Sequence, residues 1–377
     1  MEWVWKVFLA GFLATGTCGA PFVEKAPPET PPGDMMKKPD PTPPKPKPPE
    51  PTYSWQKISV PGYADGTFKK IVGAINNNQN NFGLLSKGAN NLFVQVFGEV
   101  LSGFYLPYHY KQTFSNYEIL DANYVPGHPG QFADLSGTTT DSGGKAFVNG
   151  NANIPFSTSC RYPSAYDYQG PNPATTNKLV AIHNGVAVGS DGVFTPGGIA
   201  FCHIFTLTGN PTSPVKWLYN DLTGVWTGNT KQFFIGKTST GSGDFIAITV
   251  RPFTASVPTQ IALDDKNGAG LNAIYGVSDT NVIAVGSDST LLQYDGTNWN
   301  DIAIPSELGT IDLTTVYATP DGNYVIGGEG GVVLVYRDGS FNLHRLPVTE
   351  KVISVHAWGS DDIYALTENA LYRFYLH

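Results

Sequence analysis

The feature that most constrains this chain is a repeated unit, which is clearest at residues 271–299. This stretch, LNAIYGVSDTNVIAVGSDSTLLQYDGTNW, holds three short apolar runs separated by turn-forming Ser, Asp and Gly residues. Short runs rich in β-branched and aromatic residues predict antiparallel strands. The unit recurs at 313–341 and 352–374, which gives a period of about 40 residues. Several strands in a repeat of this length predict the blades of a β-propeller.

A fourth strand follows the three runs, and its copies predict how the ring closes. Trp299 is followed by Ile302 and Pro305. Trp55 is followed by Ile58 and Pro61 at the same spacing. The last unit has three runs only, whereas the strand at 55–60 has no three runs before it. We therefore predict that the strand 55–60 completes the last blade and leaves no open edge in the ring.

The number of blades depends on a region with a weak repeat. We predict an all-β, seven-bladed β-propeller over 53–377, in which residues 101–178 form a degenerate second blade with long loops. The alternative is a six-bladed ring with an insertion at about 101–178.

Positions that recur between the units have structural roles in this interpretation. Gly286 ends the second run, where we expect a tight turn with a close approach of the backbone. We expect Trp299, Phe341 and Trp55 to pack between neighbouring blades rather than to bind a ligand.

The repeat resembles those of exported bacterial β-propellers, including surface lipoproteins and photosystem-assembly-type propellers. The resemblance rests on ten positions of the unit: Leu271, Ile274, Tyr275, Ala284, Val285, Gly286, Tyr294, Asp295, Gly296 and Trp299. It implies a scaffold and no particular chemistry, because one propeller fold hosts many unrelated roles.

The first residues resemble a bacterial lipoprotein leader. Lys6 precedes an apolar core at 7–14, and small residues then lead to Cys18. The resemblance implies a signal peptide at 1–17, lipid on Cys18, and, with Gly19 behind it, an outer-membrane or cell-surface location. The alternative is ordinary cleavage, which would give a soluble secreted protein.

Residues 18–52 are predicted to be an extended linker. The stretch is dense in Pro with alternating Lys and Glu, so it cannot bury a core and favours polyproline II. About 30 residues at ~3.1 Å each would reach on the order of 90 Å. We interpret it as a stalk between an anchored Cys18 and the propeller domain at 53–377.

Charge and cysteine content limit the partners. The net charge is −8, so the chain is not expected to bind nucleic acid. Cys160 and Cys202 lie in adjacent predicted repeats and could form one disulfide in an oxidising compartment. The alternative is two buried free thiols.

The search for chemistry gives a candidate surface but no catalytic set and no cofactor motif. Tyrosine is a common interface residue, and the candidate binding surface is formed by Tyr105, Tyr108, Tyr110, Tyr117, Tyr124, Tyr162, Tyr166 and Tyr168. The alternative is that these rings cover a widened core.

Two weaker sites are considered. His183 and His203, with Cys202, could converge across one blade, but we favour a strand histidine bonded to a backbone group. Turn aspartates could bind calcium or stabilise their own turns; these are Asp141, Asp167, Asp191, Asp264 and Asp265.

The sequence therefore predicts a non-enzymatic lipoprotein of the cell envelope or surface. Its propeller would act as a scaffold that binds an envelope protein, and lipid on Cys18 would hold it to the membrane. The first alternative is a surface propeller that binds carbohydrate. The second is a hydrolase or lyase with an unrecognised site.

Overall fold

The computed structural model describes residues 53–60, 62–74, 81–87, 220–238, 244–250, 259–262 and 270–376, together with the strands between 92 and 201. Two further features are short: a two-stranded hairpin of β5 (Glu99–Val100) and β6 (Gly103–Phe104), and the 3₁₀ turns η1 (Ser306–Leu308) and η2 (Glu329–Gly331). No helix in these parts of the chain has the length and apolarity needed to span a membrane.

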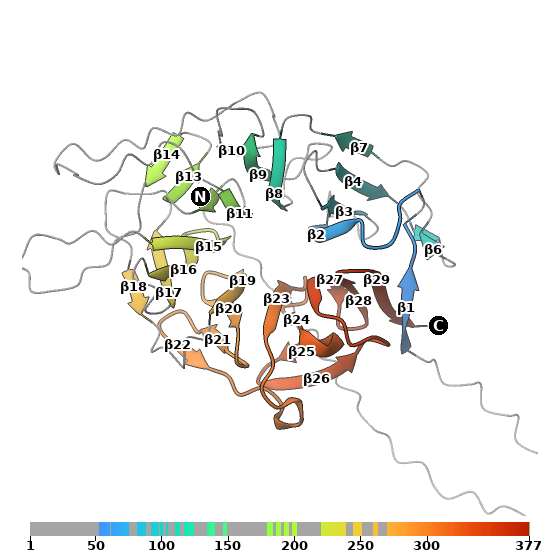
Figure 1. The fold of residues 1–377 in the computed structure, drawn as a ribbon. Helices are drawn as coiled ribbons and strands as arrows, with labels where there is room; N and C mark the ends of the chain where they lie inside the picture. Colours follow the sequence, from blue (N-terminus) through green and yellow to red (C-terminus); the bar gives the residue numbers. More distant parts are fainter. Residues whose placement is uncertain are drawn as a thin grey trace, which may run out of the picture. The chain divides into compact units, whose positions relative to one another are not determined.

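Seven sheets of three or four antiparallel strands make up the described chain (Figure 1). In chain order the first three sheets are β2 (Phe68–Ala74), β3 (Asn81–Ser86), β4 (Leu92–Phe97) and β7 (Tyr110–Thr113); then β8 (Tyr117–Asn123), β9 (Asp134–Thr139) and β10 (Ala146–Val148); then β11 (Leu179–His183), β12 (Val186–Gly189), β13 (Gly192–Thr195) and β14 (Gly198–Phe201).

The remaining four sheets come from the better-repeated part of the sequence. They are β15 (Asn220–Thr227), β16 (Lys231–Thr238), β17 (Asp244–Val250) and β18 (Thr259–Ala262); β19 (Leu271–Ser278), β20 (Asn281–Gly286), β21 (Leu291–Tyr294) and β22 (Trp299–Asp301); β23 (Leu313–Ala318), β24 (Tyr324–Gly328), β25 (Val332–Arg337) and β26 (Ser340–Arg345); and β27 (Val352–Gly359), β28 (Asp362–Thr367) and β29 (Leu371–Leu376) with β1 (Tyr53–Ile58).

The first strand of each sheet contacts the first strand of the next, and together these strands form a ring. The order of contact is β2, β8, β11, β15, β19, β23 and β27, and β27 returns to β2. This arrangement confirms the predicted all-β propeller. The number of blades in the complete ring stays a prediction, because much of 101–178 lies outside the described residues.

The closing strand is where the sequence predicted a strand, shifted by two residues. β1 pairs antiparallel with β29 along its whole length, from Tyr53 opposite Leu376 to Ile58 opposite Leu371. The strand order β1-β29-β28-β27 places β1 at the outer edge of the last sheet. The ring is therefore closed by strand pairing between segments far apart in the sequence.

Every first strand carries a register shift at the same place. The pairing with the second strand skips one residue between Phe68 and Lys70, and the equivalent shifts lie at Ile119/Asp121, Leu179/Ala181, Leu222/Gly224, Leu271/Ala273, Leu313/Thr315 and Val352/Ser354. A β-bulge bends a strand and re-aims its side chains. The shift therefore gives one common frame for residues that face the middle of the ring.

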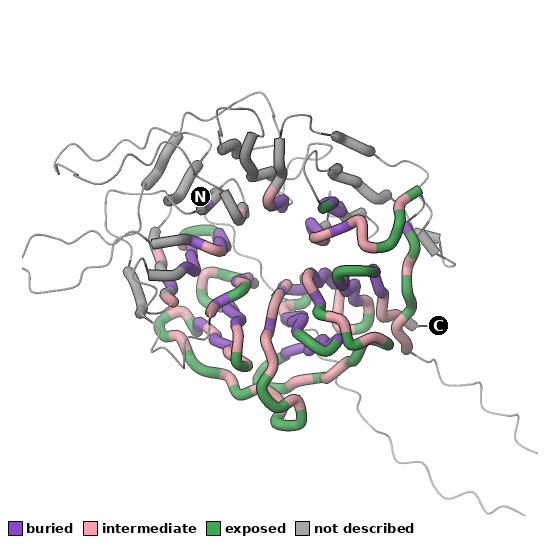
Figure 2. Tube along the Cα trace, in the orientation of Figure 1, coloured by how far each residue is buried: buried purple, intermediate pink, exposed green. Residues whose placement is uncertain are grey.

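The three aromatic residues expected between blades do pack there. Trp299 lies against Phe233 of the preceding sheet, with ring centroids 6.2 Å apart. Phe341 packs on a cluster that spans two sheets, and so does Trp55, whose ring lies 5.4 Å from that of Phe374. Among the last three sheets, buried residues concentrate on the second and third strands, and exposed residues lie mainly at the outer turns (Figure 2). The blades are thus joined mainly by apolar contact.

Gly286 makes the close approach expected from its place in the repeat. A Cβ atom at this position would lie 2.3 Å from the carbonyl oxygen of Gly270. The next residue, Ser287, donates its backbone N–H to that same oxygen at 2.9 Å. Only glycine allows the two chain segments to come this close.

One detail of the chain order differs from the sequence interpretation. We assigned residues 101–178 to a second blade, but β7 (Tyr110–Thr113) pairs with β4 and so completes the first sheet. The hairpin of β5 and β6 separates β4 from β7 along the chain. Because of this insertion, β7, the fourth strand of the first sheet, does not follow β4 at the spacing seen in the other units.

Candidate functional site

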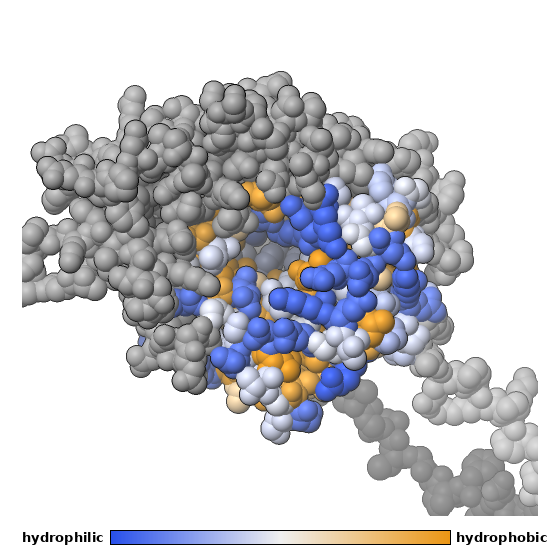
Figure 3. Space-filling model, in the orientation of Figure 1, coloured by the Kyte–Doolittle hydropathy of each residue, from blue (hydrophilic) through white to orange (hydrophobic). Residues whose placement is uncertain are grey.

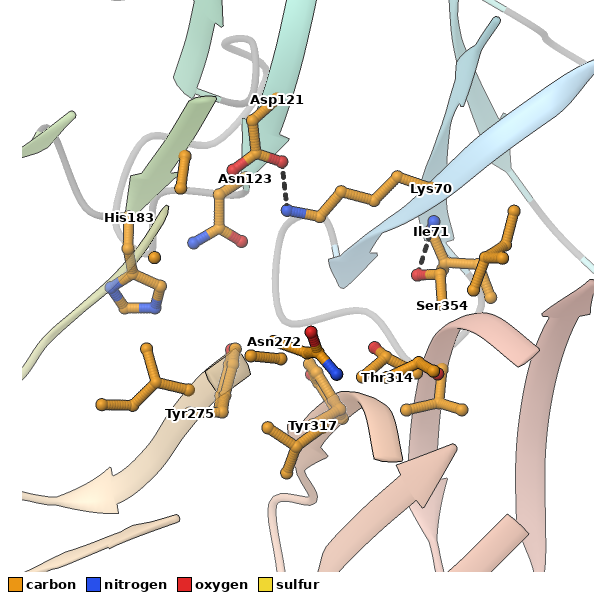
Figure 4. A pocket seen from close by; sticks show the side chains of 18 of the residues that line it. Lys70, Ile71, Asp121, Asn123, His183, Asn272, Tyr275, Thr314, Tyr317 and Ser354 are labelled. Carbon is orange, nitrogen blue, oxygen red and sulfur yellow. Dashed lines mark hydrogen bonds and ion pairs between the residues drawn. The ribbon is translucent and has the colours of Figure 1, made fainter. Parts of the chain in front are cut away.

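The first strands surround a central cavity of about 280 Å³ (Figures 3 and 4). All seven of these strands contribute lining residues, which come from the bulge and the residues just after it. Figure 3 shows a hollow near the middle of the molecule that is bordered by both hydrophilic and hydrophobic residues. The common frame of the repeat therefore brings together side chains that are far apart in the sequence.

One ion pair occupies the wall between β2 and β8. The Lys70 ammonium donates to the Asp121 carboxylate, and the two side chains are 35% and 10% exposed (Figure 4). Both residues come immediately after the bulge on neighbouring first strands. Because the charges are adjacent, they largely neutralise each other.

An aromatic arc formed by His183, Tyr275, Tyr317 and His356 runs around another part of the ring. Each residue lies four positions after the first bulge residue of its strand. Successive ring centroids are 5.6, 5.0 and 4.4 Å apart. His183, Tyr275 and Tyr317 line the cavity, whereas His356 is completely buried. The arc therefore gives the cavity an aromatic wall.

Burial raises the pKa of both tyrosines of the arc further above neutral pH. It raises the pKa of Tyr275 to about 12. Burial, and to a smaller extent the neighbouring Tyr275, raises the pKa of Tyr317 well above its usual value. Both phenols therefore retain a donor hydrogen at neutral pH.

His183 is a strand histidine bonded to a backbone group, as we favoured from the sequence. Its Nδ1 accepts the backbone N–H of Thr227 at 3.0 Å. This bond assigns the proton of the neutral imidazole to Nε2. His203 and Cys202, which the sequence considered as its companions, lie outside the described residues.

Several other polar side chains at the cavity are used by the fold itself. Asn272 donates its amide to the Leu313 carbonyl at 2.8 Å. Thr314 donates to the carbonyls of Gly327 and Val352. Ser354 accepts the backbone N–H of Ile71 at 3.0 Å. These bonds link neighbouring first strands and hold the cavity wall in place.

Most of the residues singled out from the sequence are not described. The lipidation site Cys18 and the pair Cys160 and Cys202 lie outside the described residues. Tyr110 and Tyr117 fall within β7 and β8 by backbone only, and the other six tyrosines of the candidate surface are outside, as are the five turn aspartates. Where side chains are described, no cluster of His, Cys, Asp and Glu is placed to hold a metal ion.

The sequence reasoning missed the cavity residues Lys70, Asp121, Asn123, Tyr275 and Tyr317 as a set. A signal was present, because Tyr275, Tyr317 and His356 recur four residues after the first apolar residue of their units. Aligning the first strands on that residue would have placed the aromatic positions on one ring. Nothing in the spacing marks Asp121 or Asn123, since their unit is the least regular.

Comparison with known proteins supports the architecture. No protein-family model and no curated protein matches the chain. Among solved structures it is similar to a virginiamycin B lyase from Staphylococcus aureus, with 10% identity, 86% of this chain and 100% of that chain covered, and a TM-score of 0.53. The fold of the chain is a β-propeller.

Two further solved structures resemble the chain to a similar degree, although the proteins are unrelated in name and differ in length. YCF48 from Cyanidioschyzon merolae is 14% identical, over 85% of this chain and 98% of that chain, with a TM-score of 0.51. Raptor from Chaetomium thermophilum is 12% identical, over 86% of this chain and 30% of that chain, with a TM-score of 0.52. At such identities the likeness concerns the fold alone.

Proposed function

We propose that this chain is a non-catalytic, exported propeller that binds another protein at the cell envelope. Lipid on Cys18 would anchor it, and residues 18–52 would serve as the tether between anchor and ring. The proposal combines the leader-like first residues and the Pro-rich segment with a propeller scaffold, which commonly presents broad surfaces to partners.

The position of β1 is the observation that supports this proposal best. β1 is the first strand after the Pro-rich segment, and it is the outermost strand of its sheet. The point of attachment at Tyr53 is therefore on the edge strand of its sheet, and not on one of the first strands that line the cavity.

The proposed contact surface is the tyrosine-rich region that includes Tyr108 and Tyr110. Crosslinking of native cells followed by mass spectrometry of the captured complexes tests it. We expect the double substitution Tyr108→Ala and Tyr110→Ala to remove at least one crosslinked partner. Tyr53→Ala is the matched control, because Tyr53 is an exposed tyrosine on the perimeter strand.

An unchanged set of crosslinked proteins in the double variant would reject this surface. Anchoring is tested separately by metabolic labelling with palmitate, in which wild type is expected to incorporate label and Cys18→Ser is not. Equal labelling of both chains would reject the anchor without affecting the proposed surface.

A further inference from the structure

The polar groups around the central cavity divide into those that the fold uses and those that it does not. Lys70 and Asp121 are paired with each other. Asn272, Thr314 and Ser354 bond to backbone groups of neighbouring strands. These side chains already have partners and need none from the cavity.

Among the other polar side chains at the cavity, one amide and two phenols have no such bond. The amide of Asn123 and the hydroxyls of Tyr275 and Tyr317 make no hydrogen bond to any residue whose position is described. Asn123 is only 8% exposed, and Figure 4 shows its amide pointing into the cavity between His183 and Lys70. Tyr275 and Tyr317 are half-buried, and none of the three groups is sealed away from the cavity. Their polar atoms are therefore available to bond with a molecule that enters it.

The chemistry of these groups describes the partner they fit. An amide offers donors and an acceptor, and a phenol offers one of each, so the cavity presents uncharged donors and acceptors together. The rings of the aromatic arc add apolar faces. A cavity of about 280 Å³ has space for roughly nine waters at ~30 Å³ each, which also accommodates one sugar ring.

We propose that the central cavity binds one neutral pyranose unit. Its hydroxyls would exchange hydrogen bonds with Asn123, Tyr275 and Tyr317, and its C–H faces would lie against the aromatic arc. This site is separate from the protein-binding surface proposed above and does not depend on it.

Ligands of other chemistry fit the same wall less well. A carboxylate or an ammonium ion would meet one attractive and one repulsive charge at the Lys70–Asp121 pair, so it would gain little net attraction there. An apolar ring would leave the three free polar groups unpaired. A ligand with both hydroxyls and a ring matches both parts of the wall.

Isothermal titration of the full-length chain with single compounds tests the proposal. The probes are methyl β-D-glucopyranoside, methyl β-D-galactopyranoside and N-acetyl-D-glucosamine, with glucuronic acid as the charged analogue and cyclohexanol as the ring without multiple hydroxyls. We expect at least one neutral sugar to bind with one site per chain, and more tightly than glucuronic acid or cyclohexanol.

Substitutions then locate the site. Asn123→Ala, Tyr275→Phe and Tyr317→Phe should each weaken Kd by about tenfold, the usual effect of one lost hydrogen bond. Tyr336→Phe is the matched control. The Tyr336 hydroxyl donates to Gln293 Oε1 at 2.8 Å, and neither residue lines the cavity. A melting curve of each variant checks that it folds.

Three results would overturn the proposal. They are no binding of any neutral sugar by wild type, binding of glucuronic acid alone, and sugar binding that Tyr275→Phe and Tyr317→Phe both leave unchanged. The titration of wild type tests whether the chain binds a neutral sugar, even if a variant fails to fold. Crosslinked partners should persist in Tyr317→Phe, so failure of the sugar site and failure of the proposed protein-binding function remain distinguishable.

Discussion

The hydroxyl of Tyr324 offers a direct test of how neighbouring blades are held together. Tyr324 lies on β24 and is 1% exposed. Its hydroxyl donates to the Asn281 carbonyl at 2.7 Å and accepts the backbone N–H of Val277 at 3.2 Å. Both partners belong to the preceding sheet. The hydroxyl also lies 3.1 Å from Asn281 Oδ1, a second acceptor for the same hydrogen. Tyr324→Phe therefore removes all of these contacts between blades and changes little else.

The expected loss of unfolding free energy is about 2 kcal/mol. Each hydrogen bond contributes roughly 0.5–1.5 kcal/mol net, and a buried partner left unpaired adds to the cost. Val277 is exposed, so water can bond to its backbone N–H in the variant. The expected loss of unfolding free energy therefore stays below the maximum for two lost hydrogen bonds.

Urea unfolding of the full-length chain, followed by near-UV circular dichroism, measures this loss. Tyr336→Phe is the comparison, because Tyr336 pairs with Tyr324 across the sheet and donates to the flexible amide of Gln293. We expect it to lose no more than about 1 kcal/mol. The double variant should be non-additive, since Gln293 and Asn281 are bonded to each other at 3.0 Å. A neutral Tyr324→Phe, or a larger effect in Tyr336→Phe, would refute this account.

Three further outcomes are expected. Gly286→Ala should lose about 2 kcal/mol in urea unfolding, because its Cβ would meet the Gly270 carbonyl, whereas Gly359→Ala, which meets nothing within 4 Å, should lose less than about 0.5 kcal/mol; equal effects would contradict the close approach. Burial lowers the pKa of His356 to about 3, so the unfolded chain binds a proton below about pH 6.5 that the folded chain does not, and stability should fall as pH drops from about 6.5 towards 3. His356→Phe should reduce that slope by up to about 1.4 kcal/mol per pH unit in urea unfolding at several pH values, and an unchanged slope would assign the proton elsewhere. Trp55→Ala should lower the melting temperature and cost about 2–3 kcal/mol, more than its exposed neighbour Gln56→Ala, and the reverse order would show that β1 contributes little packing.

The repeat predicted the parts of the fold that depend on local pattern. The closing strand was expected at 55–60 and is observed at Tyr53–Ile58, because the Trp55 frame matches that of Trp299. The turn at Gly286 and the position of Trp299 between blades also follow from their places in the unit. In each case one residue type suits one position in the repeat, so the sequence alone predicts the local structure there.

The cavity could not be predicted in the same way, because it is formed by residues from all seven first strands. Lys70 and Asp121 are 51 positions apart and meet only because each follows a bulge on adjacent strands. Their partnership depends on how many residues separate two irregular sheets, and no spacing rule gives that number. The histidine at 183 shows the same limit, since its partner Thr227 lies on the next sheet.

The closing strand also has a mechanical consequence. Any pull transmitted through the segment before Tyr53 acts on β1, and the first pair to feel it is Tyr53 with Leu376. Because β1 is paired with β29 on one side only, tension would separate the two strands one residue pair at a time, while the other sheets keep their strand pairing. The strand pair that closes the ring would thus be the first to bear load from the segment before Tyr53.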